Sequence, residues 1–284
     1  MTVAEIVHEA AGLLRDAGIE DERLEAEVLL AHAMGIDRTH LLAGLQTDAP
    51  AAARGAFDAM LARRLRHEPL AYIIGRREFY GLDIDCAPGA LIPRPETEML
   101  VDITLAEIAA RGAGLRIADA GTGSGAIAVV ICARSPGARV VAIEVSEQAL
   151  AVARENVRRA GLEGRIELRR GDLLEGAGVF DVIVANLPYV SVDDWAMLAP
   201  EIRDHEPREA LVGGPRGTEV IERLLATAPA HLARGGVLAA EIGDTQGASL
   251  LAAAQRCFPG AQVCVKKDLA GRDRVLEVRE RSGG

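Results

Sequence analysis

The sequence predicts an α/β protein whose mostly parallel, seven-stranded sheet is preceded by a small all-α helical bundle and a β-hairpin linker. Three observations support this class. Apolar residues recur at helical spacing in the first third of the chain, and a short glycine-punctuated stretch follows. From Leu115 onward, strand-like apolar runs alternate with helical patterns, which is typical of a parallel sheet covered on both faces. The expected boundaries are 1–69 for the bundle, 70–92 for the linker and 93–284 for the α/β domain.

Composition places the chain among globular proteins and disfavours nucleic acid as a direct partner. Of its 284 residues, 49% are hydrophobic and 26% charged, which excludes a disordered chain. The formal net charge of −10 suits a basic partner or a small ligand better than a phosphate backbone. The four cysteines are scattered, as in a reducing cytoplasm, and have no zinc-ligand spacing. With neither a signal-peptide h-region nor an apolar stretch long enough to span a bilayer, we expect a cytoplasmic protein without a metal or membrane contact.

The first third predicts four short helices. Thr2 and Glu5 form a capping box before the first helix, and the second ends at Gly35. A short third helix is expected around 41–45 and a fourth over 51–66. Short helices with brief connections indicate a bundle, and none of them carries residues at catalytic spacing.

The linker and the segment after it contain turn signals. In 70–92, three short apolar runs are separated by Gly75 and Gly81, which predicts a β-hairpin. Residues 92–98 read Ile-Pro-Arg-Pro-Glu-Thr-Glu. Its two prolines hold Arg94 extended, and the second can occupy the first position of the next helix.

The last two thirds alternate strands and helices. Ser146 is a natural N-cap and Gly161 a natural C-terminal stop for one of these helices. The expected strands cover 115–119, 138–144, 165–170, 179–185, 235–242, 261–266 and 273–279, and the helices between them lie near 125–134, 146–160, 217–230 and 246–257.

A glycine-rich loop lies between the first of these strands and its helix. Gly121, Gly123 and Gly125 allow a tight turn and a close approach of the backbone to a ligand, at the strand end where such sheets bind ligands. With Ala126 in place of the last glycine, the loop also satisfies a dinucleotide-binding pattern. Asp119, however, would repel a pyrophosphate, whereas it would tolerate the ammonium and sulfonium groups of S-adenosylmethionine (SAM).

Two further acids follow the next two strands. Glu144 can accept hydrogen bonds from both ribose hydroxyls, and Asp172 can reach the adenine amino group. Acids at three successive strand ends predict a SAM-dependent methyltransferase of class I, Rossmann-like, that releases S-adenosylhomocysteine; alternatively, the glycines make a plain turn and the acids are caps. The expected cofactor-binding residues are Asp119, Gly121, Thr122, Gly123, Gly125, Glu144, Val145, Asp172, Leu173 and Asn186.

The fourth strand of the α/β domain runs into a polar loop. The sequence Asn186-Leu187-Pro188-Tyr189 places an amide, a rigid turn and an aromatic ring beside the expected cofactor. A planar amide or aromatic amine nitrogen is a poor nucleophile because its lone pair is delocalised. Acceptors at the Asn186 side chain and the Leu187 carbonyl could hold its N–H groups and direct the lone pair toward the methyl group. The alternative is a turn on which Tyr189 merely packs.

Together these motifs resemble the PrmC/HemK family, the release-factor glutamine N5-methyltransferases. The resemblance spans nearly the whole chain, and its most specific parts are the 92–98 segment and two late motifs, Glu-Pro-Arg and Glu-Ile-Gly. The matching residues are the N-terminal bundle, 77–80, 92–98, 119–128, Glu144, 186–189, 206–208, 241–243 with Gln246, and 271–275.

The resemblance implies methyl transfer to the glutamine side-chain amide in the Gly-Gly-Gln motif of bacterial peptide-chain release factors, a step connected with translation termination. It implies that the N-terminal bundle contacts the release factor. The residues it assigns to catalysis are Asn186, Pro188 and Tyr189, and those to substrate binding are Asn186, Leu187, Pro188, Tyr189, Arg94 and Glu98.

One position departs from the family pattern. The usual loop is Asn-Pro-Pro-Tyr, and Leu187 here regains a backbone N–H donor and a free φ angle. Three alternatives remain open at this stage. They are an adenine-N6 or other planar-nitrogen methyltransferase acting on RNA or DNA, a SAM-binding interaction module with weak catalysis, and, least favoured, an NAD-dependent dehydrogenase.

Overall fold

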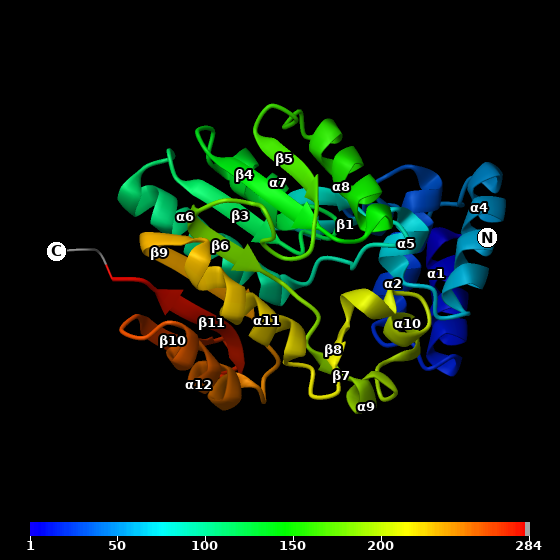
Figure 1. Cartoon of the computed structure of the whole chain (residues 1–284). Helices are drawn as coiled ribbons and strands as arrows, with labels where there is room; N and C mark the ends of the chain where they lie inside the picture. The colour runs from blue at the N-terminus through cyan, green and yellow to red at the C-terminus, as the bar shows by residue number, and fades with distance from the viewer. Residues whose placement is uncertain (282–284) are drawn as a thin grey trace. The chain divides into compact units, whose positions relative to one another are not determined.

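The computed structural model describes residues 1–281, which divide into two compact units. The first unit comprises 1–75 and 199–205, and the second comprises 76–198 and the chain from Glu206 onward. Elements of both units are labelled in Figure 1. Within residues 1–281, no helix is long and apolar enough to cross a membrane.

The first unit is helical, as the sequence predicts. The capping box is present, since Glu5 N–H donates to Thr2 Oγ1 at 3.2 Å and Thr2 N–H donates to the Glu5 carboxylate at 2.8 Å. Leu14, Leu29 and Phe57 form part of its apolar core. The helices are α1 (Val3–Asp16), α2 (Glu22–Met34), α3 (Arg38–Ala43), α4 (Ala51–Arg64), α5 (Leu70–Ile74) and α10 (Pro200–Arg203).

The last helix of this unit is held by a buried arginine. Arg64 is 3% exposed and its guanidinium contacts Glu25 at 2.5 Å and Glu201 at 2.6 Å. Glu201 lies in α10, which belongs to the helical unit although residues 76–198, directly before 199–205 in the chain, belong to the other unit. Because a buried guanidinium needs carboxylate partners, this cluster explains why a distant segment of the sequence joins the bundle.

The linker prediction is wrong at its start. Residues 70–74 form helix α5 instead of a strand, because Pro69 precedes the turn, Ile73 packs into the helical core, and Gly75 ends the helix at φ +82°. The hairpin is shorter than expected and consists of β1 (Arg76–Phe79) and β2 (Leu82–Asp85). Tyr80 and Gly81 connect the two strands with φ of +53° and +74°, the two positive values that a tight hairpin turn requires.

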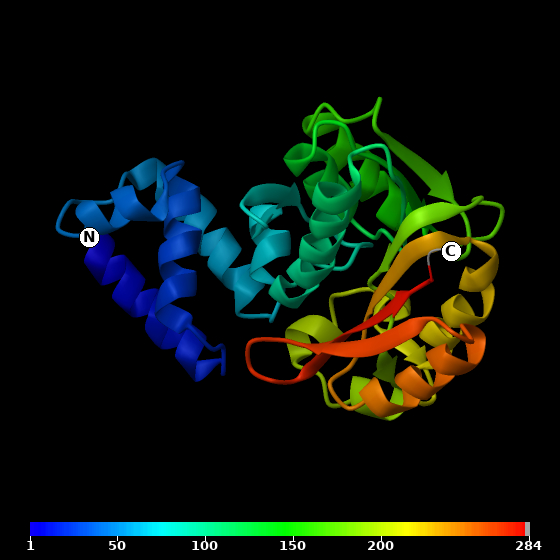
Figure 2. The same cartoon turned by 90° about the vertical axis from the view of Figure 1, so that its left-hand side faces the viewer.

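The second unit is built on the seven-stranded sheet that the sequence predicts. Its order is β10-β11-β9-β6-β3-β4-β5. Strand β11, red in Figures 1 and 2, runs antiparallel to both of its neighbours, β10 and β9, and the other pairs are parallel. Each expected strand is present to within a few residues. The strands are β3 (Arg116–Ala120), β4 (Arg139–Glu144), β5 (Ile166–Arg170), β6 (Phe180–Ala185), β9 (Leu232–Glu241), β10 (Gln262–Lys267) and β11 (Asp273–Arg279).

Helices cover both faces of this sheet. Successive residues of a strand point to opposite faces, so Ile117 joins the apolar cluster under one set of helices and Ala118 the cluster under the other. The first set is α6 (Glu98–Arg111), α7 (Ala126–Arg134) and α8 (Glu147–Arg159), and the second is α11 (Glu219–Thr227) and α12 (Gly247–Cys257). Short pieces complete the unit: η1 (Pro95–Thr97), β7 (Val190–Ser191), α9 (Val192–Trp195), η2 (Arg208–Ala210), β8 (Val212–Gly214) and η3 (Ala228–Ala230).

Candidate active site

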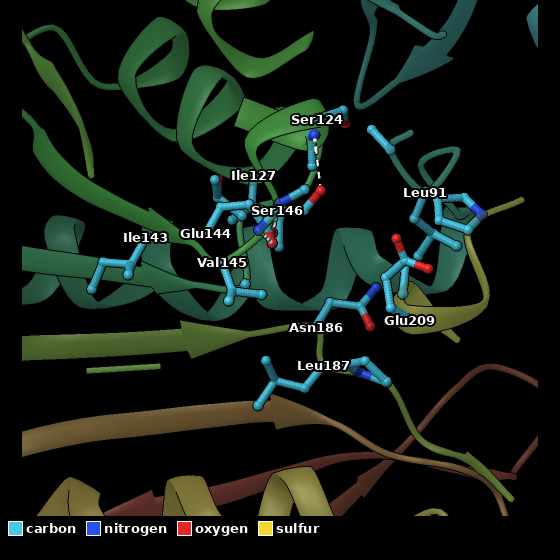
Figure 3. A pocket seen from close by; sticks show the side chains of 18 of the residues that line it. Leu91, Ser124, Ile127, Ile143, Glu144, Val145, Ser146, Asn186, Leu187 and Glu209 are labelled. Atoms are coloured by element: carbon cyan, nitrogen blue, oxygen red, sulfur yellow. Dashed lines mark hydrogen bonds between the residues drawn. The ribbon is translucent and has the colours of Figure 1, made fainter. Parts of the chain in front are cut away.

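A cavity of about 230 Å³ lies at the carboxyl ends of the parallel strands. Its walls come from the loop after β3, the end of β4, the loops after β5 and β6, and the 89–97 segment. Figure 3 shows Glu144, Asn186 and Leu187 around this cavity. Carboxyl ends of neighbouring parallel strands meet at one edge of a sheet, which is why motifs far apart in the sequence share this space.

The glycine loop has the backbone shape that only glycine adopts readily. Gly121, Gly123 and Gly125 have φ of +75°, +56° and +80°. A Cβ at Gly121 would lie 2.7 Å from Leu187 Cδ2, so the loop approaches the segment after β6 too closely for a side chain. A Cβ at Gly123 would meet no atom of residues 1–281 within 4 Å.

The Glu144 carboxylate is oriented by backbone donors. Its two oxygens accept hydrogen bonds from Gly123 N–H and Ser146 N–H, both at 2.9 Å, and the residue is 9% exposed. Each oxygen retains a further lone pair that can accept from a ligand. The carboxylate therefore ties the glycine loop to the end of β4 and still offers a pair of acceptors to a diol.

The loop after β5 supplies the other end of the cavity. Asp172 forms an ion pair with Arg223 of α11, and both residues line the cavity. Leu173 is 9% exposed and has a φ of +54°, a left-handed conformation that is uncommon for leucine. Val145 also lines the cavity and is 61% exposed. Apolar walls with one carboxylate at the rim suit a purine ring that has an exocyclic amine.

Two of the expected cofactor residues do not line the cavity. Asp119 is fully buried beneath the loop, where one carboxylate oxygen accepts from Thr122 Oγ1 at 2.6 Å and the other has no hydrogen-bond partner among residues 1–281. Burial raises the pKa of Asp119 to about 7. Gly125 faces the Ala153 side chain. Direct contact of these two residues with a cofactor stays a prediction.

Asn186 lies immediately after β6 and lines the cavity. Its Nδ2 donates to Thr97 Oγ1 at 2.9 Å. Leu187 is 4% exposed and packs into the apolar cluster beneath α11 and α12. Pro188 completes this side of the wall. The structure thus brings the expected amide, its flanking loop and the glycine loop into one cavity.

Tyr189 does not line the cavity. Its hydroxyl donates to Glu241 Oε1 at 3.0 Å. Burial, followed by the neighbouring Glu241 carboxylate, raises the pKa of Tyr189 well above its usual range. The phenol therefore stays protonated at neutral pH. Through its hydrogen bond to Glu241 it supports the loop without lining the cavity.

The backbone of the loop is held by glycines and one amide side chain. A Cβ at Gly213 would overlap the Pro188 carbonyl oxygen, and a Cβ at Gly217 would overlap the Tyr189 carbonyl oxygen. Gln246 Nε2 donates to that Tyr189 carbonyl at 2.8 Å. These contacts fix the path of the chain on both sides of the tyrosine.

The two substrate-binding candidates in the 92–98 segment have other partners. Arg94 pairs with the buried Glu206, which also accepts from Ile92 N–H at 3.1 Å. Glu98 accepts from Tyr80 N–H at 2.8 Å. Neither Arg94 nor Glu98 lines the cavity, and their contact with a substrate stays a prediction.

Sequence reasoning did not single out several residues that line the cavity. Thr97 lies within the 92–98 segment and Pro207 within the Glu-Pro-Arg motif, so these two motifs could have indicated both residues as part of the site. Glu209 and Ala210 follow directly. Among residues 1–281, no group of three or more His, Cys, Asp or Glu side chains could hold a metal ion.

Comparison with known proteins identifies the family. Residues 5–75 match the family described as PrmC N-terminal domain, and residues 97–202 match the methyltransferase small domain. The release factor glutamine methyltransferase of Cereibacter sphaeroides is 40% identical over 98% of this chain and 99% of its own. The Moorella thermoacetica protein of the same name is 42% identical over 97% and 98%.

A solved structure confirms the fold. The Thermus thermophilus 16S rRNA N2 G1207 methyltransferase, in complex with AdoMet and guanosine, aligns with a TM-score of 0.53 at 18% identity, over 72% of this chain and 50% of that one. At this identity the likeness concerns the fold alone. The two full-length relatives carry the assignment: this chain belongs to the release factor glutamine methyltransferase family.

Proposed function

We propose that this chain transfers the methyl group of SAM to the side-chain amide nitrogen (N5) of the glutamine in the Gly-Gly-Gln motif of bacterial peptide-chain release factors. One observation carries the proposal beyond family membership. Asn186, whose side chain suits a planar amide, lines the same cavity as the glycine loop and Glu144. Cofactor and substrate sites are thus contiguous, as a direct transfer requires.

The cavity residues fit SAM. Among the described residues, the backbone at Gly123 is open to a ligand, and Glu144 offers oriented acceptors for the ribose hydroxyls. Asp172 and Leu173 border the space that suits adenine. When bound, SAM supplies an electrophilic methyl group. The acidic surroundings of the loop favour its positive charges.

Asn186 would act on the substrate glutamine. Its Oδ1 and the Leu187 carbonyl can accept the two N–H groups of the glutamine amide, which directs the nitrogen lone pair toward the methyl group. The same two acceptors stabilise the positive charge that develops on nitrogen. The methylated nitrogen is acidic and loses its proton to solvent, so no dedicated base is needed. The buried Tyr189 hydroxyl, with its raised pKa, stays neutral throughout.

The helical unit would provide contacts to the release factor. This assignment follows from the match of residues 5–75 to the PrmC N-terminal domain. A protein that acts at the ribosome carries basic surface, and the net charge of −10 on this chain favours its approach. We expect the reaction to take place in the cytoplasm, with no nucleic acid or metal taking part.

Methyl transfer from labelled SAM to a purified release factor tests the proposal. A factor with glutamate in place of the Gly-Gly-Gln glutamine and a total RNA sample would serve as parallel acceptors. We expect label on the wild-type factor alone, located on the glutamine by mass spectrometry. Label on RNA would instead favour the planar-nitrogen alternative, and SAM binding without label on any acceptor would favour the interaction module.

Leu187→Pro restores the usual loop and tests whether this departure matters. We expect turnover within about 3-fold of wild type or higher, because the acceptor is the main-chain carbonyl, which the substitution keeps, and proline restricts φ. Steady-state kinetics on the release factor measure this, with circular dichroism to monitor folding. A folded but inactive variant would mean that the loop is shaped for another substrate.

A further inference from the structure

We propose that Thr97 and Glu241 are positioning residues that set the orientation of the Asn186 amide, an inference that rests on the function proposed above. Three hydrogen bonds carry it. Asn186 Nδ2 donates to Thr97 Oγ1 at 2.9 Å, and Thr97 Oγ1 donates to Glu241 Oε2 at 2.7 Å. The other carboxylate oxygen, Oε1, accepts from the Tyr189 hydroxyl at 3.0 Å.

The carboxylate gives this chain of hydrogen bonds a direction. Both oxygens of the Glu241 carboxylate accept from hydroxyl groups, Oε2 from Thr97 and Oε1 from Tyr189, so the single hydroxyl proton of Thr97 is committed to Glu241. Thr97 then has only lone pairs to offer Asn186, so the amide must present Nδ2 to it. The Asn186 Oδ1 is consequently left for the cavity, where an acceptor is needed to bind a glutamine N–H.

Burial makes this direction hard to reverse. Thr97 is 4% exposed and Glu241 is 1% exposed, so water has little access to the hydrogen bond between them. An amide flip would place Asn186 Oδ1 against a hydroxyl oxygen whose proton points elsewhere, so this partly buried oxygen would lose a donor at that position. Burial raises the pKa of Glu241, and the Thr97 and Tyr189 hydroxyls and the charge of Arg274 oppose this rise without cancelling it.

The fold explains why these residues meet. Strands β6 and β9 are parallel neighbours with Ala185 paired to Ala240, so Asn186, directly after β6, lies beside Glu241, the last residue of β9. Thr97 is the last residue of η1 and lines the cavity. A strand end, a neighbouring strand end and a proline-anchored turn therefore converge on one amide.

Thr97→Val tests the proposal because valine keeps the shape of threonine and removes the hydroxyl. We expect kcat on the release factor to fall roughly 10- to 100-fold through misorientation of one catalytic group, with the Kd for SAM changed less than about 3-fold. Thr97→Ser should recover most of the turnover. Thr104→Val is a matched control, because Thr104 is also buried but its hydroxyl donates to the Leu100 carbonyl within α6. For this variant we expect wild-type kcat.

A double-mutant cycle separates positioning from general damage. If Thr97 acts through Asn186, adding Thr97→Val to Asn186→Ala should lower kcat by less than about 2-fold further. Wild-type turnover in Thr97→Val, or a full additional loss in the double mutant, would overturn the proposal. Failure of the wild-type protein to methylate the release factor would instead count against the proposed function.

A readout without substrate completes the test. In wild type, the Asn186 side-chain NH₂ should give a hydrogen-exchange-protected signal in a ¹⁵N NMR spectrum, because one of its protons is bonded to Thr97. In Thr97→Val that protection should be lost, and in Thr97→Ser it should be retained. Equal protection in the valine variant would overturn the proposal whatever the enzyme assay shows.

Discussion

Replacing Asn186 with alanine is expected to lower kcat by 10²-fold or more, about the loss of one preorganised polar contact in the transition state. Binding of SAM should stay within about 3-fold of wild type, since Glu144 and the glycine loop form the remainder of the cofactor cavity. Turnover on the release factor and isothermal titration with SAM measure the two effects separately.

The opposite pattern would contradict this role for Asn186. A variant that no longer binds SAM, with turnover lost only in proportion, would make Asn186 a cofactor ligand instead of a group that acts on the substrate. Circular dichroism should show a folded protein, because within residues 1–281 the Asn186 side chain donates a hydrogen bond to Thr97 alone.

Glu144→Ala is expected to raise the Kd for SAM by about 10²-fold or more. The substitution removes the proposed acceptor for the ribose hydroxyls, and charge-assisted hydrogen bonds contribute about 1.5–3 kcal/mol each. It also frees Gly123 N–H and Ser146 N–H, so the glycine loop loses its tie to β4. Isothermal titration with SAM measures the change, and kcat at saturating SAM should fall much less than kcat/KM.

Glu147→Ala is the matched control for this prediction. Glu147 lies three residues further along, begins α8, and forms a surface ion pair with Arg154 at 2.8 Å. Exposed pairs of this kind contribute about 0–1 kcal/mol, so the Kd for SAM should stay near wild type. If Glu144→Ala binds SAM as tightly as wild type does, the Glu144 carboxylate does not contribute to cofactor binding.

Much of the fold could be read from local patterns. Strands β3 and β6 are short, largely apolar runs in the sequence, bounded by glycine or proline. Ser146 caps α8 as expected, because its side chain accepts a hydrogen bond from Ala149 N–H. The exception, residues 70–74, shows the limit of such reasoning. Tyr-Ile-Ile favours a strand by propensity, yet burial of Ile73 in the helical core decides the conformation.

The candidate site divides in the same way. Gly121, Glu144 and Asn186 lie in local sequence motifs, and their residue types and positions after strands indicate the roles that we predict for them. Thr97 and Glu241 lie in the motifs at 92–98 and 241–243, but their roles arise only from contacts between distant residues. Thr97 is 89 positions from Asn186 and 144 positions from Glu241. Such contacts depend on strand order and register, which one sequence does not reveal.

The glycines that hold the loop after β6 explain how position 187 can differ from the usual family motif. Gly213 and Gly217 lie close against the carbonyls of Pro188 and Tyr189. The path of the chain here is therefore determined by residues outside the motif. A ring at position 187 is then redundant for shape, and leucine is tolerated there while its side chain fills the apolar cluster below. A side chain at either glycine would displace a carbonyl of the loop. We therefore expect natural variants to differ at position 187 and to keep glycine at 213 and 217.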